Sequence, residues 1–314
     1  MTRKRAAGVL FGGLALGAAP VSAGAQTNSM LRIATIPIEP GAQVYYAQDM
    51  GFFAKAGLDV DIQAMTTGPG IAAALVSNAV DIGFGSVDAV AAIHQKNVPL
   101  VLIAAASDYV SPGSSRTTGL VVPVSSAIQT AKDLKGKVIA VTAINGITHT
   151  VAEAWLDQNG GDSTSAKFVE IPLAAMPAAL EAGRVDAVWI SEPFLEEAKK
   201  NGRVLVYGFD TVAKHFISTA WLCTVQWAGD HPDLARRFAA VMHQTAVWAN
   251  TNDAASAQVL AKYTRADPAV IATQARSHFA VDLVPAALQP LIDVAAKYNN
   301  FATFPARELI FAPR

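Results

Sequence analysis

Four predicted strand ends are each followed directly by the start of a predicted helix. These helix starts lie near Gly41, Ser86, Gly146 and Ser191. A helix start presents unpaired backbone N–H groups and about half a positive charge, which suits a sulfonate, a carboxylate or a polar ring oxygen. Because ligands of open parallel sheets bind beyond the carboxyl ends of the strands, we expect the four helix starts to face one small molecule.

The third helix start carries most of the candidate ligand contacts. They are Asn145, Gly146, Thr148 and His149. A neutral imidazole can donate or accept a hydrogen bond, and a hydroxyl can do both. Thr150 and Glu153 fit a capping box, so we interpret one threonine of this turn as structural. Ser86 is a further candidate contact, although Ser86 and Ser191 are also explained as helix N-caps.

Aromatic side chains near these positions could contact the body of a ligand or fill the core. Tyr45 and Tyr46 are adjacent on the first predicted helix and cannot share a face, so we assign one to the core and keep Tyr45 as the cleft candidate. Trp189 lies at the end of a predicted strand over 186–190, where it fits either a buried core or an aromatic cleft wall. Trp221 lies on the predicted return crossing between the two halves of the chain, a position that favours a place in the cleft wall near the hinge.

Carboxylates outnumber cations at the predicted cleft edge. Arg116 is the one basic candidate there, and the acidic candidates are Glu39, Asp88, Asp108 and Glu192. Asp88 and Glu192 are also explained by the dipole of the helices that they begin. If one of these carboxylates faces the ligand, an amine or N–H donor fits better than a simple anion such as nitrate.

Composition excludes several classes of protein. With 24 basic and 25 acidic side chains in 314 residues, the chain offers no electrostatic footprint for nucleic acid. Cys223 is the only cysteine, which excludes an internal disulfide and a zinc site built on paired cysteines, and we interpret it as a buried small hydrophobe. The sequence contains no Gly-x-Ser-x-Gly, His-Glu-x-x-His or Walker motif. We therefore expect no catalytic residue, no metal and no cofactor.

The N-terminus has the three parts of an export signal. Arg3, Lys4 and Arg5 precede an apolar run over Ala6–Ala19, and small residues follow near Ala23. The apolar run is shorter than the roughly 20 residues that a membrane span needs. We expect residues 1–25 to be a cleaved signal peptide and the mature protein to be periplasmic and not embedded in the membrane.

The remaining chain carries an internal repeat. An ungapped shift of 105 residues places residues 31–86 on residues 136–191 and aligns Val80-Asp81 with Val185-Asp186. Both halves predict strands that alternate with helices, which is typical of parallel α/β units. We predict strands over 31–37, 58–65, 81–85, 99–107, 118–122, 137–141, 168–171 and 186–190. Helices are predicted over 42–54, 71–79, 147–158 and 177–182, and several more after His231.

Two breaks in this pattern divide the chain into two lobes. Residues 111–115 interrupt the strands, and the apolar stretch over 219–225 can carry the chain back. We assign residues 30–115 and 220–314 to the first lobe and residues 116–219 to the second. The expected architecture is α/β, with two parallel or mixed sheets flanked by helices and a ligand cleft between the lobes.

Five stretches of the sequence resemble one family. They are Gln43–Val60, Val80–Ser86, Asp133–Val138, Ala179–Ala187 and His231–Leu234. The chain is similar here to extracytoplasmic solute-binding proteins of the sulfonate, nitrate, taurine and thiamine-precursor group. The resemblance implies the type II periplasmic-binding-protein fold, hinged closure around a small molecule, and permease and ATPase subunits of an ABC importer as partners. It leaves the ligand open.

Two functions compete at this stage. The first is capture of a small organic solute, sulfonate-like, aromatic or N-heterocyclic, by a monomer that delivers it to the importer. The alternative is an enzyme on the same fold, such as a relative from pyrimidine or menaquinone synthesis. The absence of a catalytic motif and the export signal favour the binding protein.

Overall fold

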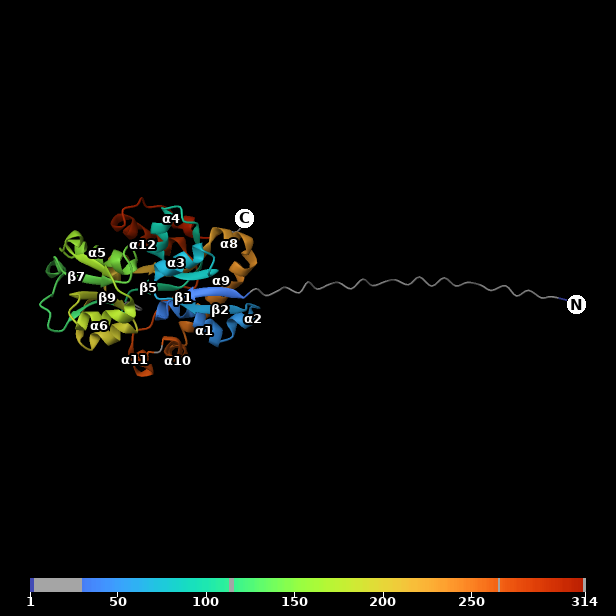
Figure 1. Cartoon of the computed structure of the whole chain (residues 1–314), viewed down its shortest axis with the longest axis horizontal. Helices are drawn as coiled ribbons and strands as arrows, with labels where there is room; N and C mark the ends of the chain where they lie inside the picture. Colours follow the sequence, from blue (N-terminus) through green and yellow to red (C-terminus); the bar gives the residue numbers. More distant parts are fainter. Residues whose placement is uncertain (3–29, 113–115, 265, 313–314) are drawn as a thin grey trace.

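The structure is a computed structural model, and it describes residues 1–2, 30–112, 116–264 and 266–312. The predicted signal peptide lies outside the described residues except for its first two. Strands alternate with helices along the chain, as predicted for an α/β fold (Figure 1). Within the described ranges, none of the helices combines the length and apolar character that a membrane crossing requires.

The first sheet is built mainly from the N-terminal part of the chain. Its strands are β1 (Leu31–Thr35), β2 (Val60–Ala64), β3 (Ile82–Ser86), β4 (Leu100–Ala105) and β12 (Thr219–Thr224). They lie in the order β2-β1-β3-β12-β4. Strand β1 pairs in parallel with β2 and β3, whereas β12 runs antiparallel to β3 and β4. A strand from late in the chain therefore completes the middle of this sheet.

The second sheet is contiguous in sequence. Its strands are β6 (Thr118–Pro123), β7 (Val138–Val141), β8 (Lys167–Glu170), β9 (Ala187–Ser191) and β10 (Gly202–Val206). They lie in the order β10-β6-β9-β7-β8. Strand β7 pairs in parallel with β8 and β9, and β6 runs antiparallel to β9 and β10. Both sheets are thus mixed, as the sequence allowed.

The predicted repeat is confirmed by the order of the strands. The series β2-β1-β3-β12 in the first sheet matches β8-β7-β9-β6 in the second, with the same orientations. An ion pair recurs at the same place, with Arg32 2.7 Å from Asp81 and Lys137 3.3 Å from Asp186. Each aspartate also accepts a backbone N–H from the neighbouring strand at 2.8 Å. The two halves therefore share pairing chemistry as well as topology.

A small third sheet lies where the chain passes between the two larger sheets. It consists of β11 (His215–Ile217), β5 (Ser107–Val110) and β13 (His278–Phe279), in that order. Strand β5 follows β4 and precedes β6, and β11 stands between β10 and β12. Both connections between the larger sheets therefore run through it, although residues 113–115 of the first lie outside the described residues. The single strand predicted over 99–107 is divided between β4 and β5.

Helices cover both large sheets (Figure 1). They are α1 (Gln43–Asp49), α2 (Phe52–Lys55), α3 (Gly68–Val76), α4 (Val87–His94), α5 (Ile147–Gln158), α6 (Met176–Glu181), α7 (Phe194–Lys199), α8 (Val225–Asp230), α9 (Pro232–Ala249), α10 (Asp253–Thr264), α11 (Pro268–Thr273) and α12 (Pro285–Tyr298). Short 3-10 turns occupy Glu39–Gly41, Ala131–Leu134, Ser163–Ser165, Leu173–Ala175, Gly208–Thr211 and Ala306–Leu309. The helix predicted over 42–54 is split into α1 and α2 by Gly51, whose φ of 68° ends the first helix.

The C-terminal helices do more than pad the first lobe. Helix α12 packs against α4, which follows β3 of the first sheet, and against α5, which follows β7 of the second. Figure 1 shows α12 between these two helices. The sequence assigns these helices to the first lobe, and α12 also contacts α5, so its position joins elements of both sheets.

Trp221 lies in the core of the first sheet and not at a hinge wall. Its side chain is fully buried, and its indole N–H donates to Gln43 Oε1 at 2.7 Å. Gln43 in turn donates to the carbonyl of Met242 at 2.9 Å. Burial of an indole is favourable when its N–H finds a partner, so this chain of bonds fixes α1 and α9 on the sheet.

Candidate ligand cavity

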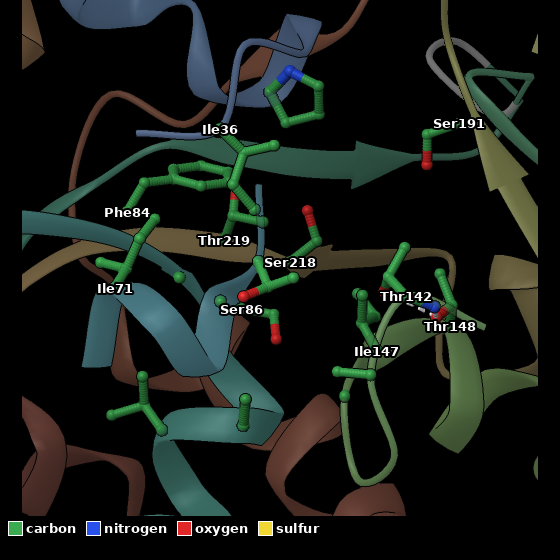
Figure 2. A pocket seen from close by; sticks show the side chains of 18 of the residues that line it. Ile36, Ile71, Phe84, Ser86, Thr142, Ile147, Thr148, Ser191, Ser218 and Thr219 are labelled. Atoms are coloured by element: carbon green, nitrogen blue, oxygen red, sulfur yellow. Dashed lines mark hydrogen bonds between the residues drawn. The ribbon is translucent and has the colours of Figure 1, made fainter. Parts of the chain in front are cut away.

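A cavity of about 300 Å³ lies between the two large sheets. Its wall combines the ends of β3, β7 and β9 with the starts of α3, α4 and α5 and with residues of the third sheet. Figure 2 shows side chains from these elements pointing into the same space. The ligand position expected from strand ends and helix starts is therefore the position of a real cavity.

Most of the wall is apolar. The first sheet and its helices contribute Ile36, Ile71, Phe84, Ile93 and Leu222, and the opposite side contributes Ile147, Leu173 and Phe209. An apolar wall with a few placed polar groups is typical of sites for small organic molecules. The cavity is thus suited to a molecule with a hydrocarbon or ring body.

The polar part of the wall consists mainly of hydroxyl groups that bond to one another. Thr142 and Thr148 are joined at 2.9 Å between their hydroxyls (Figure 2), and Thr118 is joined to Ser191 at 2.9 Å. A third group joins Ser107 to Ser218 at 3.0 Å and to Thr219 at 2.7 Å. Each hydroxyl can donate or accept, so these groups can turn toward either kind of ligand atom.

The start of α5 is the most open of the helix starts around the cavity. Gly146 is its N-cap and supplies no side-chain hydrogen bond, and the first turn contains no acidic residue. By contrast, the start of α4 holds Asp88, and its first N–H, from Val87, donates to the carbonyl of Ser218 at 3.1 Å. Because unpaired N–H groups favour an anion, the start of α5 is the better place for an oxyanion.

Two charged groups belong to the cavity wall, Asp108 and Lys96, with no other charged side chain among its described residues. Asp108 is 8% exposed and is held between two imidazoles, His215 at 3.0 Å and His278 at 2.5 Å. The hydrogen bond to Asp108 raises the pKa of His278. Lys96 lies beyond the end of α4 and is exposed. The carboxylate is therefore already engaged by protein groups.

Four of the predicted contact residues line the cavity. They are Ser86, Asn145, Gly146 and Thr148. Ser86 ends β3, and its hydroxyl makes no capping bond to α4. It instead hydrogen-bonds the Asp88 carboxylate, which opposes the rise in the pKa of that group. Asn145 adopts a φ of 61°, a left-handed conformation that asparagine tolerates and that turns the chain into α5. That these residues contact a ligand stays a prediction.

Glu39 was expected at the cleft edge but is fully buried elsewhere. Its carboxylate forms an ion pair with Arg276 and accepts from Gln274 Nε2 at 3.1 Å. Burial raises the pKa of Glu39, and the charge of Arg276 opposes that rise. Both partners lie in the segment after α11, so the role of Glu39 is structural: it holds that segment in place.

Tyr45 and Trp189 also belong to the core. The ring of Tyr45 stacks on Tyr263 with centroids 4.2 Å apart, and only 4% of the residue is exposed. Trp189 is fully buried against Gly208, where an added Cβ would lie 2.5 Å from the indole ring. Neither side chain lines the cavity, because each fills the space behind a sheet or helix.

Asp88 and Glu192 are buried carboxylates outside the cavity. Asp88 accepts a hydrogen bond from Thr150 Oγ1 at 3.1 Å, and burial raises its pKa to about 6. Thr150 lies inside α5, whose N-cap is Gly146, so it does not form the capping box predicted with Glu153. Glu192 accepts the N–H of Glu196 at 3.2 Å, and burial, with the charge of Glu196, raises its pKa to about 8. Glu192 thus caps the first turn of α7, the alternative that the sequence left open, whereas Asp88 lies in the first turn of α4 and bonds across to α5.

His149 supports the cavity wall from behind. Its Nδ1 lies 3.3 Å from the N–H of Asn145, and its ring meets Phe168 edge to face at 4.5 Å. Burial lowers the pKa of His149 to about 4, so the imidazole is neutral at pH 7 and accepts this bond. Burial also raises the pKa of Glu153, 3.3 Å away, to about 7. The contact between the two is therefore not an ion pair.

Several residues that line the cavity were not among the helix starts predicted from the sequence. Thr67, Gly68 and Pro69 begin α3 directly after β2, with Thr67 accepting the N–H of Gly70 at 3.2 Å. The same rule that selected the other helix starts applies here, because threonine and proline are typical of a helix start. Ser107 of the third sheet, and Ser218 and Thr219 where β11 leads into β12, had no comparable signal, since only the fold brings them to the cavity.

The shared strand order, the two mixed sheets and the cavity between them define a type II periplasmic-binding-protein fold. The chain belongs to the NMT1/THI5-like family, whose model matches residues 41–255, more than half of its length. The resemblance to the sulfonate, nitrate, taurine and thiamine-precursor group is thereby confirmed.

Three relatives illustrate the range of this fold. The taurine-binding periplasmic protein of Escherichia coli (strain K12) is 28% identical over 193 residues, a match that spans 61% of this chain and only 58% of that protein. The alkanesulfonate-binding protein SsuA from Xanthomonas axonopodis pv. citri, solved bound to MOPS, has a TM-score of 0.74 at 19% identity over 90% of this chain and 98% of its own. The desulfurization enzyme DSZB has a TM-score of 0.65 at 16% identity over 91% and 97%.

Proposed function

We propose that this protein captures a small organic solute with an oxyanion head, of which a sulfonate is the leading example, and delivers it to the permease of an ABC importer. The observation that carries the proposal is the apolar cavity with the uncapped start of α5 in its wall. Relatives named for binding taurine and alkanesulfonates support the choice of head group.

The cavity suggests how such a solute is oriented. The head lies at Gly146 and Thr148, where backbone N–H groups and a hydroxyl meet. The body, aliphatic, aromatic or N-heterocyclic, lies against Ile71, Phe84 and Ile93. Apolar burial gains about 25 cal/mol for each Å² removed from water, so the body contributes most of the affinity and the head sets the orientation. No bond is made or broken.

Ser86 and Asn145 complete the proposed set of ligand contacts. Both line the cavity, and Ser86 stands opposite Thr148 on the wall that belongs to the first sheet (Figure 2). A solute held at both walls stabilises their approach. We therefore propose two lobes, residues 30–115 with 220–314 and residues 116–219, which close around the solute as hinged domains do.

Export and assembly belong to the same proposal. Residues 1–25 act as a cleaved signal peptide, and the mature chain works as a monomer in the periplasm, where it meets the permease and its ATPase. Recovery of a mature N-terminus near Gly24 or Gln26 in the periplasmic fraction supports export. Recovery of the intact Met1 form in the inner membrane overturns it.

An enzyme on this fold is the alternative, because a desulfurization enzyme shares the topology. Cys223 is the one thiol that could act as a nucleophile, and it is fully buried. Burial raises its pKa to about 12, so the reactive thiolate is scarce at neutral pH. Among the described residues, no group of three or more His, Cys, Asp or Glu side chains is arranged to hold a metal. These observations favour binding over chemistry.

A thermal-shift series on the mature protein tests the proposal. The probes are taurine, MOPS, 1-butanesulfonate, benzoate and sodium nitrate, because a ligand that binds only the folded state raises the melting temperature. We expect a sulfonate with an organic body to give the largest rise and nitrate none. A rise with nitrate alone, or a probe that is released chemically altered, overturns the proposal.

A further inference from the structure

A buried hydrogen bond joins the two halves of the molecule directly behind the cavity. Asp88 lies in the first turn of α4, after β3 of the first sheet, and Thr150 lies in α5, after β7 of the second. Thr150 Oγ1 donates to Asp88 Oδ2 at 3.1 Å, and both residues have no exposed surface. The bond therefore exists only while α4 and α5 stand against each other.

A third residue meets this bond from α12. Asn299 follows the last turn of α12, and its Nδ2 lies 3.5 Å from Thr150 Oγ1. Helix α12 packs on both α4 and α5, so Asn299 is delivered to the place where the two halves touch (Figure 1). Asp88, Thr150 and Asn299 form a three-residue cluster, which we call the interlobe cluster.

The interlobe cluster is not fully satisfied. Asp88 Oδ1 and Asn299 Oδ1 are buried without a hydrogen-bond partner among the described residues. Removing such atoms from water is costly, and the raised pKa of Asp88 reflects that cost. Opening the molecule would return both oxygens to water but break the bond from Thr150. The cluster therefore opposes opening only moderately, as a reversible closure requires.

The cluster is coupled to the cavity through the chain itself. Ser86 lines the cavity two residues before Asp88, and Thr148 lines it two residues before Thr150. The same two helix starts thus present one residue to the cavity and another to the cluster. None of the three cluster residues lines the cavity.

We propose that Asp88, Thr150 and Asn299 form a latch that favours the closed arrangement of the lobes and thereby sets solute affinity without touching the solute. This goes beyond the proposed function, because the latch acts on the lobes whether or not a solute is bound. The three are positioning residues, and a change in the latch alters how often the cavity is closed.

Distances between labels on the two lobes test the latch without any ligand. Two exposed valines are suitable label sites, one on each lobe. Val76, at the end of α3, is 52% exposed, and Val124, after β6, is 63% exposed. The substitutions Val76→Cys and Val124→Cys allow a spin label to be attached at each. Cys223 is fully buried and stays unlabelled. In this labelled protein we expect Thr150→Val to lower the ratio of closed to open molecules by about fivefold, the value of one buried hydrogen bond. Asn299→Ala shifts the ratio less, in the same direction.

Two matched variants separate the latch from general loosening. Thr150→Ser keeps the hydroxyl and should restore the closed population. Thr245→Val makes the same change at a buried threonine of α9 whose hydroxyl bonds to Val241 of its own helix, and should leave the distances unchanged. Unaltered distances in both Thr150→Val and Asn299→Ala, or an equal shift in Thr245→Val, overturn the latch.

Titration with taurine and MOPS then keeps the latch and the proposed function apart. If either probe binds, Thr150→Val should weaken it by the same factor that it lowers the closed population, and an unchanged affinity overturns the role in binding. If neither probe binds even the unsubstituted protein, the proposed solute class fails, while the label distances still decide the latch.

Discussion

Removing the guanidinium of Arg276 should destabilise the protein strongly although Arg276 is not a cavity residue. Glu39 has no exposed surface, and its ion pair with Arg276 supplies the opposite charge. Arg276 also donates to the carbonyl of Asp253 at 2.8 Å and to Ser256 Oγ at 2.9 Å. Arg276→Met would leave a buried carboxylate without its cation and two acceptors without their donor.

The size of the effect follows from this geometry. Breaking a buried ion pair by removing one partner costs about 3–5 kcal/mol, because the remaining charge stays desolvated. For a domain of this size each kcal/mol lowers the melting temperature by roughly 2–4 °C, so we expect a loss of about 6–20 °C. Glu39→Gln should cost only about 1–2 kcal/mol, since the amide keeps its bond to Gln274 and Arg276 is partly exposed to water.

Calorimetry on both single variants and the double variant measures the coupling. The double variant should be more stable than Arg276→Met alone, because no unpaired carboxylate is left buried. Arg236→Met is the matched control, since Arg236 is 67% exposed and 3.9 Å from Asp233, and it should change stability by less than about 0.5 kcal/mol. A loss below 1 kcal/mol in Arg276→Met, or strictly additive single effects, would refute this reasoning.

Three further perturbations give separate readings. The pKa of Glu192 is raised from 4.5 to about 8, so between these pH values the folded state holds a proton that the unfolded state has lost. Unfolding in urea should therefore show stability falling from pH 6 to 8, and Glu192→Gln should reduce this pH dependence. Thr148→Val should weaken taurine or MOPS about fivefold or more in titration calorimetry, and undiminished affinity would remove this hydroxyl from the site. The same change should cost about 1–3 kcal/mol of stability, because the hydroxyl also accepts the N–H of Thr142 at 3.0 Å. Gly208→Ala should cost about 1–3 kcal/mol by clashing with Trp189, whereas Gly229→Ala, with open space around it, should be neutral or stabilising when both are compared by thermal unfolding.

The sequence was sufficient to predict the repeated order of strands and helices, two large sheets and the place of the cavity, but not the third sheet or the order of the strands. The shift of 105 residues carries β3, residues 82–86, onto 187–191, the bounds of β9. Ser86, Gly146 and Ser191 line the cavity. They could be predicted because strand ends and helix starts are local features, which hydrophobic periodicity and glycine reveal. Local pattern therefore located the site.

The sequence could not show which polar side chains turn toward the cavity. Glu39 is neutralised by Arg276 from far along the chain, and Tyr45 is covered by Tyr263. Asp88 looks like a rim carboxylate until Thr150 arrives from the other sheet. In each case the deciding partner is distant in sequence, so only the folded arrangement assigns the side chain to the core. Asp108, in contrast, does reach the cavity wall.

The position of β12 has a consequence for the order in which the protein can fold. Strand β12 separates β3 from β4 in the first sheet, so these two strands have no direct pairing and must wait for Thr219–Thr224. The second sheet uses only strands between Thr118 and Val206 and can close earlier. When the chain becomes available from its N-terminus onward, the first sheet therefore stays incomplete until most of the length is present. Delayed closure of non-local pairs slows folding. Under the export proposed above, it would give the chain time to cross a membrane before its core is sealed.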